Sequence, residues 1–433
     1  MAWKRPINAG IPASDASPRP PRRPRKPIPA ALKAVAGLVI VAIVFLVAAV
    51  LGGGSSDKSS NQAAPAPAPP AAANEQRETP AAAAAEELGY PSFATNNTTR
   101  VGGSDPATTA AGVALAVFPS TTPAQRPAAV ALVDEADWQG AIAASVLMSA
   151  PLRVPLLVSS GDGFPDPTSQ ALEVLDPQGS SDSGGAQAFA VGSAPAPEGL
   201  KTTQVKGKGA EPATLAAAVA ALRDKLFGSP PQHIVLASED ESAFAMPAAA
   251  WAARSGDPVL FTGAKKLPAA TLTALKRHPK VPVYVLGPSS AISTGVLREV
   301  AKVDKQVRRV SGKSPVENAI ALARHASGGF GWNVNDPGHG FVVARSDSPL
   351  DAAVAAPLSA SGTWGPLLLT ENADTLPKAL REYLLDVKPG YTTDPTRAFY
   401  NHVWVIGDQE AIDVNQQADI NQLAELAKVG GEE

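Results

Sequence analysis

The feature that most constrains the fold of this chain is a pattern that occurs three times after residue 99. Each copy opens with a basic or polar residue, a valine, a turn that contains glycine, a proline and an alanine-rich segment. Proline in the first turn of a helix loses no hydrogen bond and presets the backbone, so each opening predicts a helix start. The openings run from Arg100 to Pro106, from Gln204 to Pro212 and from Arg309 to Pro315.

Each opening is followed by three apolar strand-like segments in a fixed order. The first leads into an acidic or polar turn and an alanine-rich helix, the second is entered through proline, and the third ends in glycine. Helices that cross between short apolar strands are typical of parallel sheets. The segments begin near Ala129, His233 and Gly340, near Pro155, Pro258 and Pro366, and before Gly192, Gly287 and Gly407.

The predicted fold class is therefore α/β, with three Rossmann-like repeats in a pseudo-threefold arrangement. The repeats are placed at residues 99–200, 201–304 and 305–433, and about 100 residues is a suitable size for one small α/β unit. After Gly192 the first copy continues directly into a loop, whereas the other two copies continue into helices. The first copy is thus predicted to be trimmed.

The order of these elements resembles the bacterial cell wall-binding repeat 2 family. The resemblance rests on the R-V-x-G opening, the D-A helix start at Asp351, the P-[LV]-L-[LF]-T strand and the final V-x-V-[LI]-G strand, and it covers roughly residues 98–428. It implies three α/β units packed about a pseudo-threefold axis and non-covalent attachment to wall polysaccharide. The chain departs from the pattern where Gly140 and Phe244 replace the helix-start aspartate and where Gln204 replaces the opening arginine.

An apolar run without charged residues occupies residues 34–51. At about 1.5 Å per residue it would cover roughly 27 Å as a helix, close to the thickness of the hydrocarbon core of a bilayer. The alternative is a cleaved signal peptide, whose apolar region is shorter and ends in small residues such as Gly52 to Gly54. The length of the run favours a retained transmembrane helix.

The segments on either side of this run predict the orientation of the chain. Residues 1–33 form a Pro-rich tail with eight lysines and arginines against a single aspartate, and residues 52–98 form a Pro- and Ala-rich linker. Both compositions predict disorder. The positive-inside rule then predicts a single-pass plasma membrane protein with a cytoplasmic N-terminus and an extracytoplasmic C-terminal domain.

Motifs for catalysis are incomplete in this sequence. The G-K-S of a phosphate-binding loop occurs at Gly312, but the glycine required five positions earlier is Val307. The five histidines lack metal-ligand spacing, there is no G-x-S-x-G motif, and the absence of cysteine excludes thiol chemistry. Acidic turns such as Asp134–Glu135 recur before helices, where carboxylates act as caps. The sequence therefore predicts no enzyme, no cofactor and no metal.

Candidate binding residues lie in the loops that open and follow the strands, because open α/β sheets bind ligands at the carboxyl ends of their strands. Tryptophan can stack on a sugar, while arginine and aspartate can hold hydroxyls or anions. Trp138 is alternatively a core residue, and the two opening arginines alternatively pair with acidic helix caps. The candidates are Arg100, Asp137, Trp138, Arg309, Arg345, Ser346 and Asp351.

The leading hypothesis is a membrane-tethered, non-catalytic envelope protein whose three repeats bind a cell wall polysaccharide. A protein-interaction scaffold for envelope proteins and a hydrolase of wall material are the alternatives. The region after Arg100 is net acidic, which counts against general adhesion to anionic polymers or nucleic acid. Recognition is therefore expected to depend on local contacts.

Overall fold

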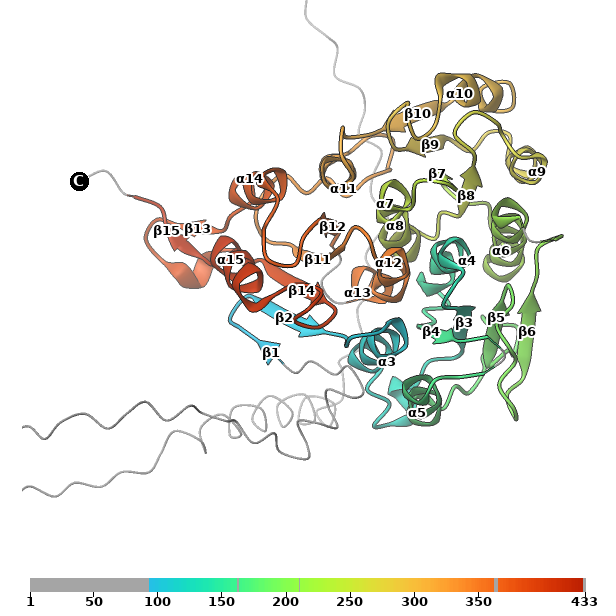
Figure 1. The fold of residues 1–433 in the computed structure, drawn as a ribbon, viewed down its shortest axis with the longest axis horizontal. Helices are drawn as coiled ribbons and strands as arrows, with labels where there is room; N and C mark the ends of the chain where they lie inside the picture. The colour runs from blue at the N-terminus through green and yellow to red at the C-terminus, as the bar shows by residue number, and fades with distance from the viewer. Residues whose placement is uncertain (1–92, 162, 210, 362–364, 431–433) are drawn as a thin grey trace, which may run out of the picture. The chain divides into compact units, whose positions relative to one another are not determined.

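A computed structural model gives the fold of residues 93–161, 163–209, 211–361 and 365–430. Within these residues the chain is an α/β protein with three mainly parallel sheets and helices between the strands (Figure 1). The mixed α/β class with parallel sheets is thereby confirmed. The basic tail, the apolar run and the linker up to residue 92 lie outside the described residues.

The first sheet has four parallel strands in the order β4–β3–β5–β6. Ala131 of β3 lies opposite Leu156 of β4. The strands are β3 (Val130–Asp134), β4 (Leu156–Ser159), β5 (Ala188–Val191) and β6 (Thr202–Val205). The connections carry η1 (Pro123–Gln125), α4 (Trp138–Ala144), η2 (Ser145–Met148) and α5 (Asp166–Leu175), and no helix lies between β5 and β6.

The second sheet repeats this arrangement in the order β8–β7–β9–β10. Val235 of β7 lies opposite Val259 of β8, as Ala131 lies opposite Leu156 in the first sheet. The strands are β7 (Ile234–Ser238), β8 (Val259–Thr262), β9 (Val283–Leu286) and β10 (Val307–Val310). The helices are α7 (Ser242–Ala245), α8 (Pro247–Ser255), α9 (Ala269–Arg277) and α10 (Thr294–Val300).

The third sheet has the order β12–β11–β14–β2, with antiparallel β1 added at its edge. Its strands are β11 (Gly340–Arg345), β12 (Leu367–Thr370), β14 (His402–Ile406), β2 (Thr98–Val101) and β1 (Phe93–Ala94). Its helices are α12 (Pro349–Val354), α13 (Ala356–Ala360), α14 (Lys378–Asp386) and α15 (Val414–Ala424), with η3 (Pro395–Arg397) before β14. A small separate pair is formed by β13 (Gly390–Tyr391) and β15 (Ala427–Lys428).

The strand that opens each copy of the sequence pattern is added to a sheet whose other parallel strands come from another copy. β6 and β10 lie beside β5 and β9, which precede them in the chain. β2 lies beside β14, with Arg100 opposite Val405, so the first opening closes the last sheet. Each of these strands leads into a helix that starts at proline, as predicted: α3 (Pro106–Val117), α6 (Pro212–Phe227) and α11 (Pro315–Arg324).

The helices that follow the central strands pack against one another across the three sheets. α4 contacts α12, and α8 contacts both η2 and α13, so these helices lie together between the sheets (Figure 1). Their contact faces are rich in alanine, and Ala144, Ala252 and Ala356 are at most 1% exposed. Side chains of this size allow the helix backbones to approach closely, and interiors are packed densely enough that larger ones would not fit.

A glycine in each opening allows the turn to approach its own helix. A Cβ atom on Gly103 would lie 2.4 Å from Thr108 Cγ2, and one on Gly207 would lie 2.4 Å from Thr214 Oγ1. A Cβ atom on Gly312 would lie 2.2 Å from the carbonyl carbon of Glu317. The glycine of the repeated opening is thus required by close packing in all three copies.

The opening arginine fixes the loop that follows the neighbouring strand. Arg100 is 2% exposed, and its Nη1 donates to the carbonyls of Gly407, at 2.9 Å, and Asp408, at 2.5 Å. Its Nη2 donates to the carbonyl of Ile412 at 2.5 Å, and its Nε donates to Gln417 Oε1 at 3.0 Å. Burial lowers the pKa of Arg100, and the charges of Asp408 and Asp413 oppose that shift.

The other two openings make shortened forms of this contact. Arg309 donates to the carbonyls of Gly287 and Ile292, which occupy the positions of Gly407 and Ile412 in the second sheet. Gln204 donates to the carbonyl of Gly192 at 3.3 Å. The residue that varies between copies therefore keeps one function, which is to bind the carbonyl at the end of the neighbouring strand. We call this contact the carbonyl clamp.

The predicted trimming of the first copy is confirmed in one place and incomplete in another. No helix lies between β5 and β6, whereas α10 and α15 follow β9 and β14. The same copy does contain α5, a helix after β4 that the sequence pattern did not indicate. Asp166 and Pro167 in its first turn were the available signals.

The predicted localisation, a single-pass plasma membrane protein with a cytoplasmic N-terminus, is corrected. None of the helices within the described ranges is long and apolar enough to cross a bilayer. The longest, α6, has 16 residues and carries Arg223, Asp224 and Lys225. Residues 34–51, on which the prediction of a transmembrane helix depended, lie outside the described residues.

Replacing Arg100 by alanine is expected to lower the free energy of unfolding by about 3 kcal/mol, because buried carbonyls lose charged donors. Arg309→Gln is expected to lower it by less than about 1 kcal/mol, because Gln204 shows that an amide can serve in this position. Urea denaturation of the purified chain measures both. Arg298→Ala, on the exposed face of α10, is the control, and an Arg100→Ala protein as stable as this control would contradict the clamp.

Candidate functional site

A cleft of about 390 Å³ lies at the carboxyl end of the third sheet. Its walls are the turn before α12, the loop after β14, the opening of α3 and the start of α4 from the first sheet. The lining includes Gly103, Ser104, Asp105, Pro106, Thr109, Glu135, Trp138, Ser348, Pro349, Leu350, Asp351, Gly407, Asp408, Glu410 and Ala411. We call it the tryptophan cleft.

Trp138 forms one wall of this cleft. It is the first residue of α4, whose N-cap Asp137 accepts a hydrogen bond from the backbone N–H of Gly140 at 2.7 Å. The indole is half-buried and meets Phe261 edge to face, with ring centroids 5.9 Å apart. Trp138 is therefore anchored in the core on one side and borders the cleft on the other, and its contact with a ligand stays a prediction.

Asp351 contributes a carboxyl group to the same cleft. It lies in the first turn of α12, and its side chain has no hydrogen-bond partner among the described residues. Burial, with the charges of Asp347, Asp105 and Asp408, raises the pKa of Asp351 from 3.8 to about 7. Near neutral pH a protonated carboxyl group is thus present that can donate a hydrogen bond to a ligand oxygen.

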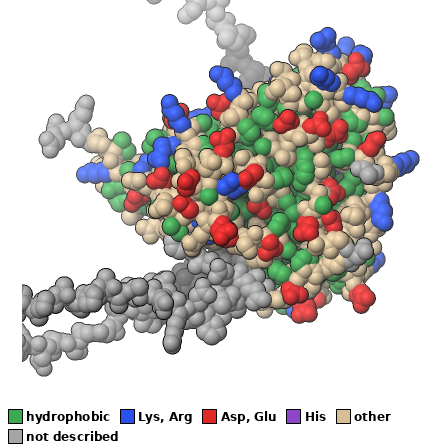
Figure 2. All heavy atoms as spheres, in the orientation of Figure 1, with side chains coloured by type: hydrophobic (Ala, Val, Ile, Leu, Met, Phe, Trp, Pro, Cys, Tyr) green, Lys and Arg blue, Asp and Glu red, His purple; other side chains and the backbone are tan. Residues whose placement is uncertain are grey.

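Two of the other four acidic residues that line the cleft are already used as caps. Asp105 accepts from the backbone N–H of Thr108 at 2.9 Å, and Asp408 accepts from those of Glu410 and Ala411 at 3.0 and 2.9 Å. These carboxylates stabilise helix starts and turns. The lining of the cleft holds five acidic residues and no lysine or arginine. On the face of the molecule in view in Figure 2, acidic side chains lie over the middle and lower part, and lysines and arginines lie mostly toward the margins. The surroundings of the cleft are therefore negative.

Arg345 and Ser346 lie beside the tryptophan cleft, in the turn after β11. Arg345 Nε and Nη2 donate to Asp347 at 3.1 and 2.6 Å, and Nη1 donates at 3.3 Å to the carbonyl of Ala411, which lines the cleft. The backbone N–H of Ser346 donates to Thr370 at 2.9 Å, and its side chain is partly exposed. The positive charge of Arg345 is thus paired at the border.

A second cleft, of about 500 Å³, occupies the corresponding position at the first sheet. It lies between the turn after β3 and the opening of α6, and Asp137, Gly192 and Gly207 line it. Burial raises the pKa of Asp137, the hydrogen bond from Gly140 opposes that rise, and the charge of Asp134 adds to it. The start of α4 therefore separates two clefts, with Trp138 facing one and Asp137 the other.

The three copies carry different residues at one position of these clefts. The strand registers place Gly140, Phe244 and Asp351 in equivalent positions. A Cβ atom on Gly140 would lie 2.3 Å from Asp137 Oδ2, and the Cβ of Phe244 lies 3.5 Å from where a Cβ on Gly287 would be. A carboxyl group therefore faces a cleft at this position in the third copy, whereas an aromatic ring takes its place in the second.

The structure brings Trp138 and Asp351 together and places the remaining candidates around them or elsewhere. Asp137 lines the neighbouring cleft, and Arg345 and Ser346 lie at the border. Arg100 and Arg309 do not line the tryptophan cleft but donate to backbone carbonyls in the carbonyl clamps. The charges of Asp408 and of Asp413, the N-cap of α15, act on Arg100.

The sequence interpretation missed Asp105 and Asp408, which line the tryptophan cleft. Asp105 directly precedes Pro106, a signal for a helix cap, and Asp408 follows the glycine that ends β14. Neither signal shows that the two residues share a cleft. That proximity comes from the pairing of β2 with β14.

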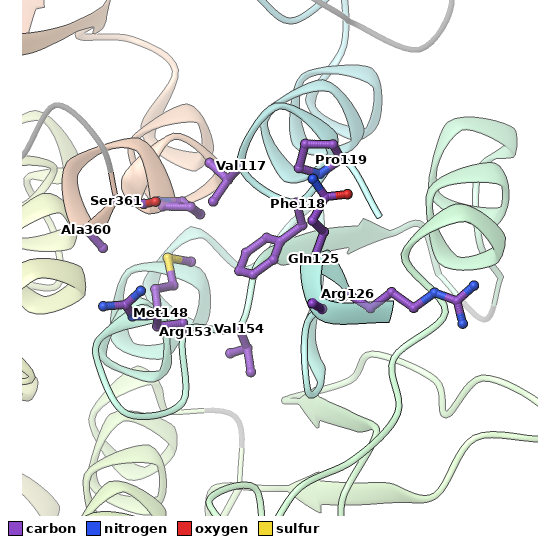
Figure 3. A pocket seen from close by; sticks show the side chains of 12 residues that line it. Val117, Phe118, Pro119, Gln125, Arg126, Met148, Arg153, Val154, Ala360 and Ser361 are labelled. Carbon is purple, nitrogen blue, oxygen red and sulfur yellow. The ribbon is translucent and has the colours of Figure 1, made fainter. Parts of the chain in front are cut away.

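A smaller cavity of about 210 Å³ contains none of the predicted residues. Figure 3 shows Phe118, Met148 and Val154 on its walls, with Arg126 directed away from it. Arg126 forms an ion pair with Asp176. Among the described residues, no group of three or more His, Cys, Asp or Glu side chains is arranged to hold a metal ion.

Comparison with known proteins adds a family match to this geometry. Residues 208–297 and 309–416 match the model of the family described as Cell wall binding domain 2 (CWB2). The two matched ranges contain parts of the second and third copies of the repeated pattern and together cover less than half of the chain. This family match supports cell wall binding. A search of curated proteins found no match.

Two solved structures share the fold. Cwp6 from Clostridium difficile has a TM-score of 0.60 and 17% sequence identity, covering 76% of this chain and 48% of that one. Cwp8 from Clostridium difficile has a TM-score of 0.57 and 20% identity, covering 76% of this chain and 52% of that one. The chain therefore spans about half the length of each, and at these identities the likeness shows the fold alone.

Asp351→Asn is expected to remove a pH dependence of stability. Because the folded state holds the Asp351 proton up to about pH 7 and the unfolded state releases it near pH 3.8, the free energy of unfolding of the native protein should fall between these values. The fall is on the order of 2 to 4 kcal/mol. Urea denaturation at several pH values measures it.

The exposed Asp182→Asn is the matched control for this experiment. Relative to that control, Asp351→Asn should gain stability as the pH rises from 4 to 8. Parallel pH curves for the two variants would show that Asp351 titrates normally.

Proposed function

We propose that this protein is a non-catalytic cell-envelope protein that binds a wall polysaccharide in the tryptophan cleft. The observation that carries the proposal is the meeting of Trp138 and Asp351, from the first and third copies, in one cleft at the carboxyl ends of parallel strands. An aromatic face beside a hydrogen-bonding carboxyl group suits a sugar ring. The CWB2 matches support a binding rather than a catalytic role and a location at the cell surface.

We further propose that the three units are related by a pseudo-threefold axis and correspond to the repeats at 99–200, 201–304 and 305–433. The common strand order of the sheets supports this relation. So do the contacts of α4 with α12 and of α8 with α13. In this arrangement each opening strand is part of one repeat in the sequence but forms its hydrogen bonds with a strand of the neighbouring repeat.

The charge of the tryptophan cleft restricts the polymer that it can bind. Asp105, Glu135, Asp408 and Glu410 line it together with Asp351, whereas the nearby Arg345 is paired with Asp347. These groups would repel an anionic polymer, because bringing negative charges together costs free energy. The carboxylates are instead stabilised by water or by cations. The preferred units are therefore uncharged sugars or sugars that carry an amine.

Trp138→Ala is expected to weaken binding to isolated wall at least about tenfold, which corresponds to about 1.4 kcal/mol. Loss of a central aromatic contact typically costs this much or more. The measurement is co-sedimentation of the purified chain with two preparations of isolated wall. One preparation keeps its secondary polysaccharides, and the other has had them extracted.

Phe399→Ala is the matched control, because Phe399 is an aromatic residue that is 70% exposed and does not line the cleft. It should bind wall as the native protein does. If the native protein sediments with neither wall preparation, or if both variants bind equally, the proposed function is wrong. If crosslinking then joins this protein reproducibly to one protein partner, that result would favour the scaffold alternative.

A further inference from the structure

A separate pocket of about 530 Å³ lies at the amino ends of β7, β8 and β11. Trp251 and Asp257 border it from the second sheet, and Trp332 and His339 border it from the segment between α11 and β11. It lies at the opposite ends of the strands from the tryptophan cleft. We call it the indole pocket, and we infer that it binds one uncharged pyranose unit of a glycan against Trp332.

The indole pocket depends on a segment that is much longer than its counterpart in the second copy. Residues 325–339 connect α11 to β11, whereas residues 228–233 make the corresponding connection from α6 to β7. Gly329 and Gly331 have φ values of 83° and 96°, which favour glycine. A Cβ atom on Gly331 would lie 2.2 Å from the carbonyl oxygen of His325. The longer segment can therefore fold back on itself and form a wall.

An aromatic cluster holds this wall against the second sheet. Phe330 is 1% exposed and stacks on Tyr284 with ring centroids 3.8 Å apart and planes 10° apart. It also meets Trp251 at 4.9 Å and His233 at 5.6 Å. Because Phe330 comes from the third copy and its contacts from the second, the cluster fixes the pocket between two sheets.

Trp332 lies two residues after this anchor and keeps part of its indole exposed. It meets Trp251 edge to face, with centroids 5.7 Å apart and planes 82° apart. Its Nε1–H has no acceptor among the described residues, so ring packing alone sets the orientation of the indole. The indole can thus adjust to a ligand without breaking a hydrogen bond within the described part of the protein. Sugars present C–H faces that pack well on such a ring.

The charged pair in the pocket wall is already satisfied within the protein. Asp257, 1% exposed, accepts from the backbone N–H of His233 at 2.9 Å, from His233 Nδ1 at 3.0 Å and from Trp251 Nε1 at 3.0 Å. His233 Nε2 lies 2.9 Å from the carbonyl of Gly328. Burial lowers the pKa of His233, but its hydrogen bonds to Asp257 and Gly328 outweigh burial and raise it. The pair is therefore an internally compensated ion pair.

The remaining polar lining, which includes the exposed Arg254 and Ser255, can bind hydroxyl groups. Gln232 is exposed at the pocket, and its amide offers both a donor and an acceptor that no described residue uses. His339 lies 3.2 Å from Asp336 through Nε2. A partly exposed aromatic ring, an amide and a compensated ion pair match a ligand with an apolar face and many hydroxyls, which is an uncharged pyranose.

The test is saturation-transfer NMR on the full chain with the methyl glycosides of glucose, galactose, mannose and N-acetylglucosamine, with glycerol as the non-ring control. At least one glycoside should give a saturable signal that glycerol does not compete away. Trp332→Ala should weaken its affinity at least tenfold, and Gln232→Ala at least threefold. No saturable signal from any glycoside would overturn the inference.

Trp404→Ala is the matched control, because Trp404 is a half-buried tryptophan on β14 that lines neither the indole pocket nor the tryptophan cleft. It should bind as the native protein does. If Trp332→Ala fails to fold, Trp332→Phe and Gln232→Ala decide, and native affinity in both overturns the inference. A glycoside signal that is lost in Trp138→Ala and kept in Trp332→Ala would support the tryptophan cleft and overturn the indole pocket.

Discussion

The pairing of β2 with β14 is the constraint on which the candidate site depends. It joins residues near the start of the folded region to residues about 300 positions later, with Arg100 opposite Val405. Arg100 then binds the carbonyls of Gly407, Asp408 and Ile412 and thereby shapes the loop that lines the tryptophan cleft. The pairing acts together with the packing of α12 against α3 and α4, which holds the first sheet beside Asp351.

The elements of the fold were readable from the sequence because they depend on local chemistry. Proline at Pro106, Pro212 and Pro315 marks helix starts, and apolar runs mark the buried strands. The function of Arg100 was not readable, because its partners are backbone carbonyls from another copy. Every residue carries a backbone carbonyl, so the sequence does not mark the carbonyls that an arginine binds. An arginine that binds carbonyls and an arginine that binds a ligand therefore look the same in the sequence.

Only part of the candidate site was predicted, because the sequence shows which residues lie in turns but not which turns meet in space. Trp138 and Asp351 were each recognised as residues in turns after strands, but only the contact of α4 with α12 brings them to one cleft. The raised pKa of Asp351 likewise comes from burial and from Asp105 and Asp408, which are distant in sequence. Helix α5 was missed because its sequence has a single alanine, whereas α3 and α4 are rich in alanine.

The differences between the copies bear on how such a protein binds. A strictly symmetric domain would present three equal clefts, but Gly140, Phe244 and Asp351 make the three equivalent positions unlike. The glycine is needed for the cap by Asp137, and the phenylalanine packs beside Gly287, so two of the three changes serve the fold. Only Asp351 leaves a carboxyl group without a partner in the described residues. Burying this carboxyl group without a hydrogen bond costs free energy. A ligand in the tryptophan cleft would supply the missing hydrogen bond and remove that cost.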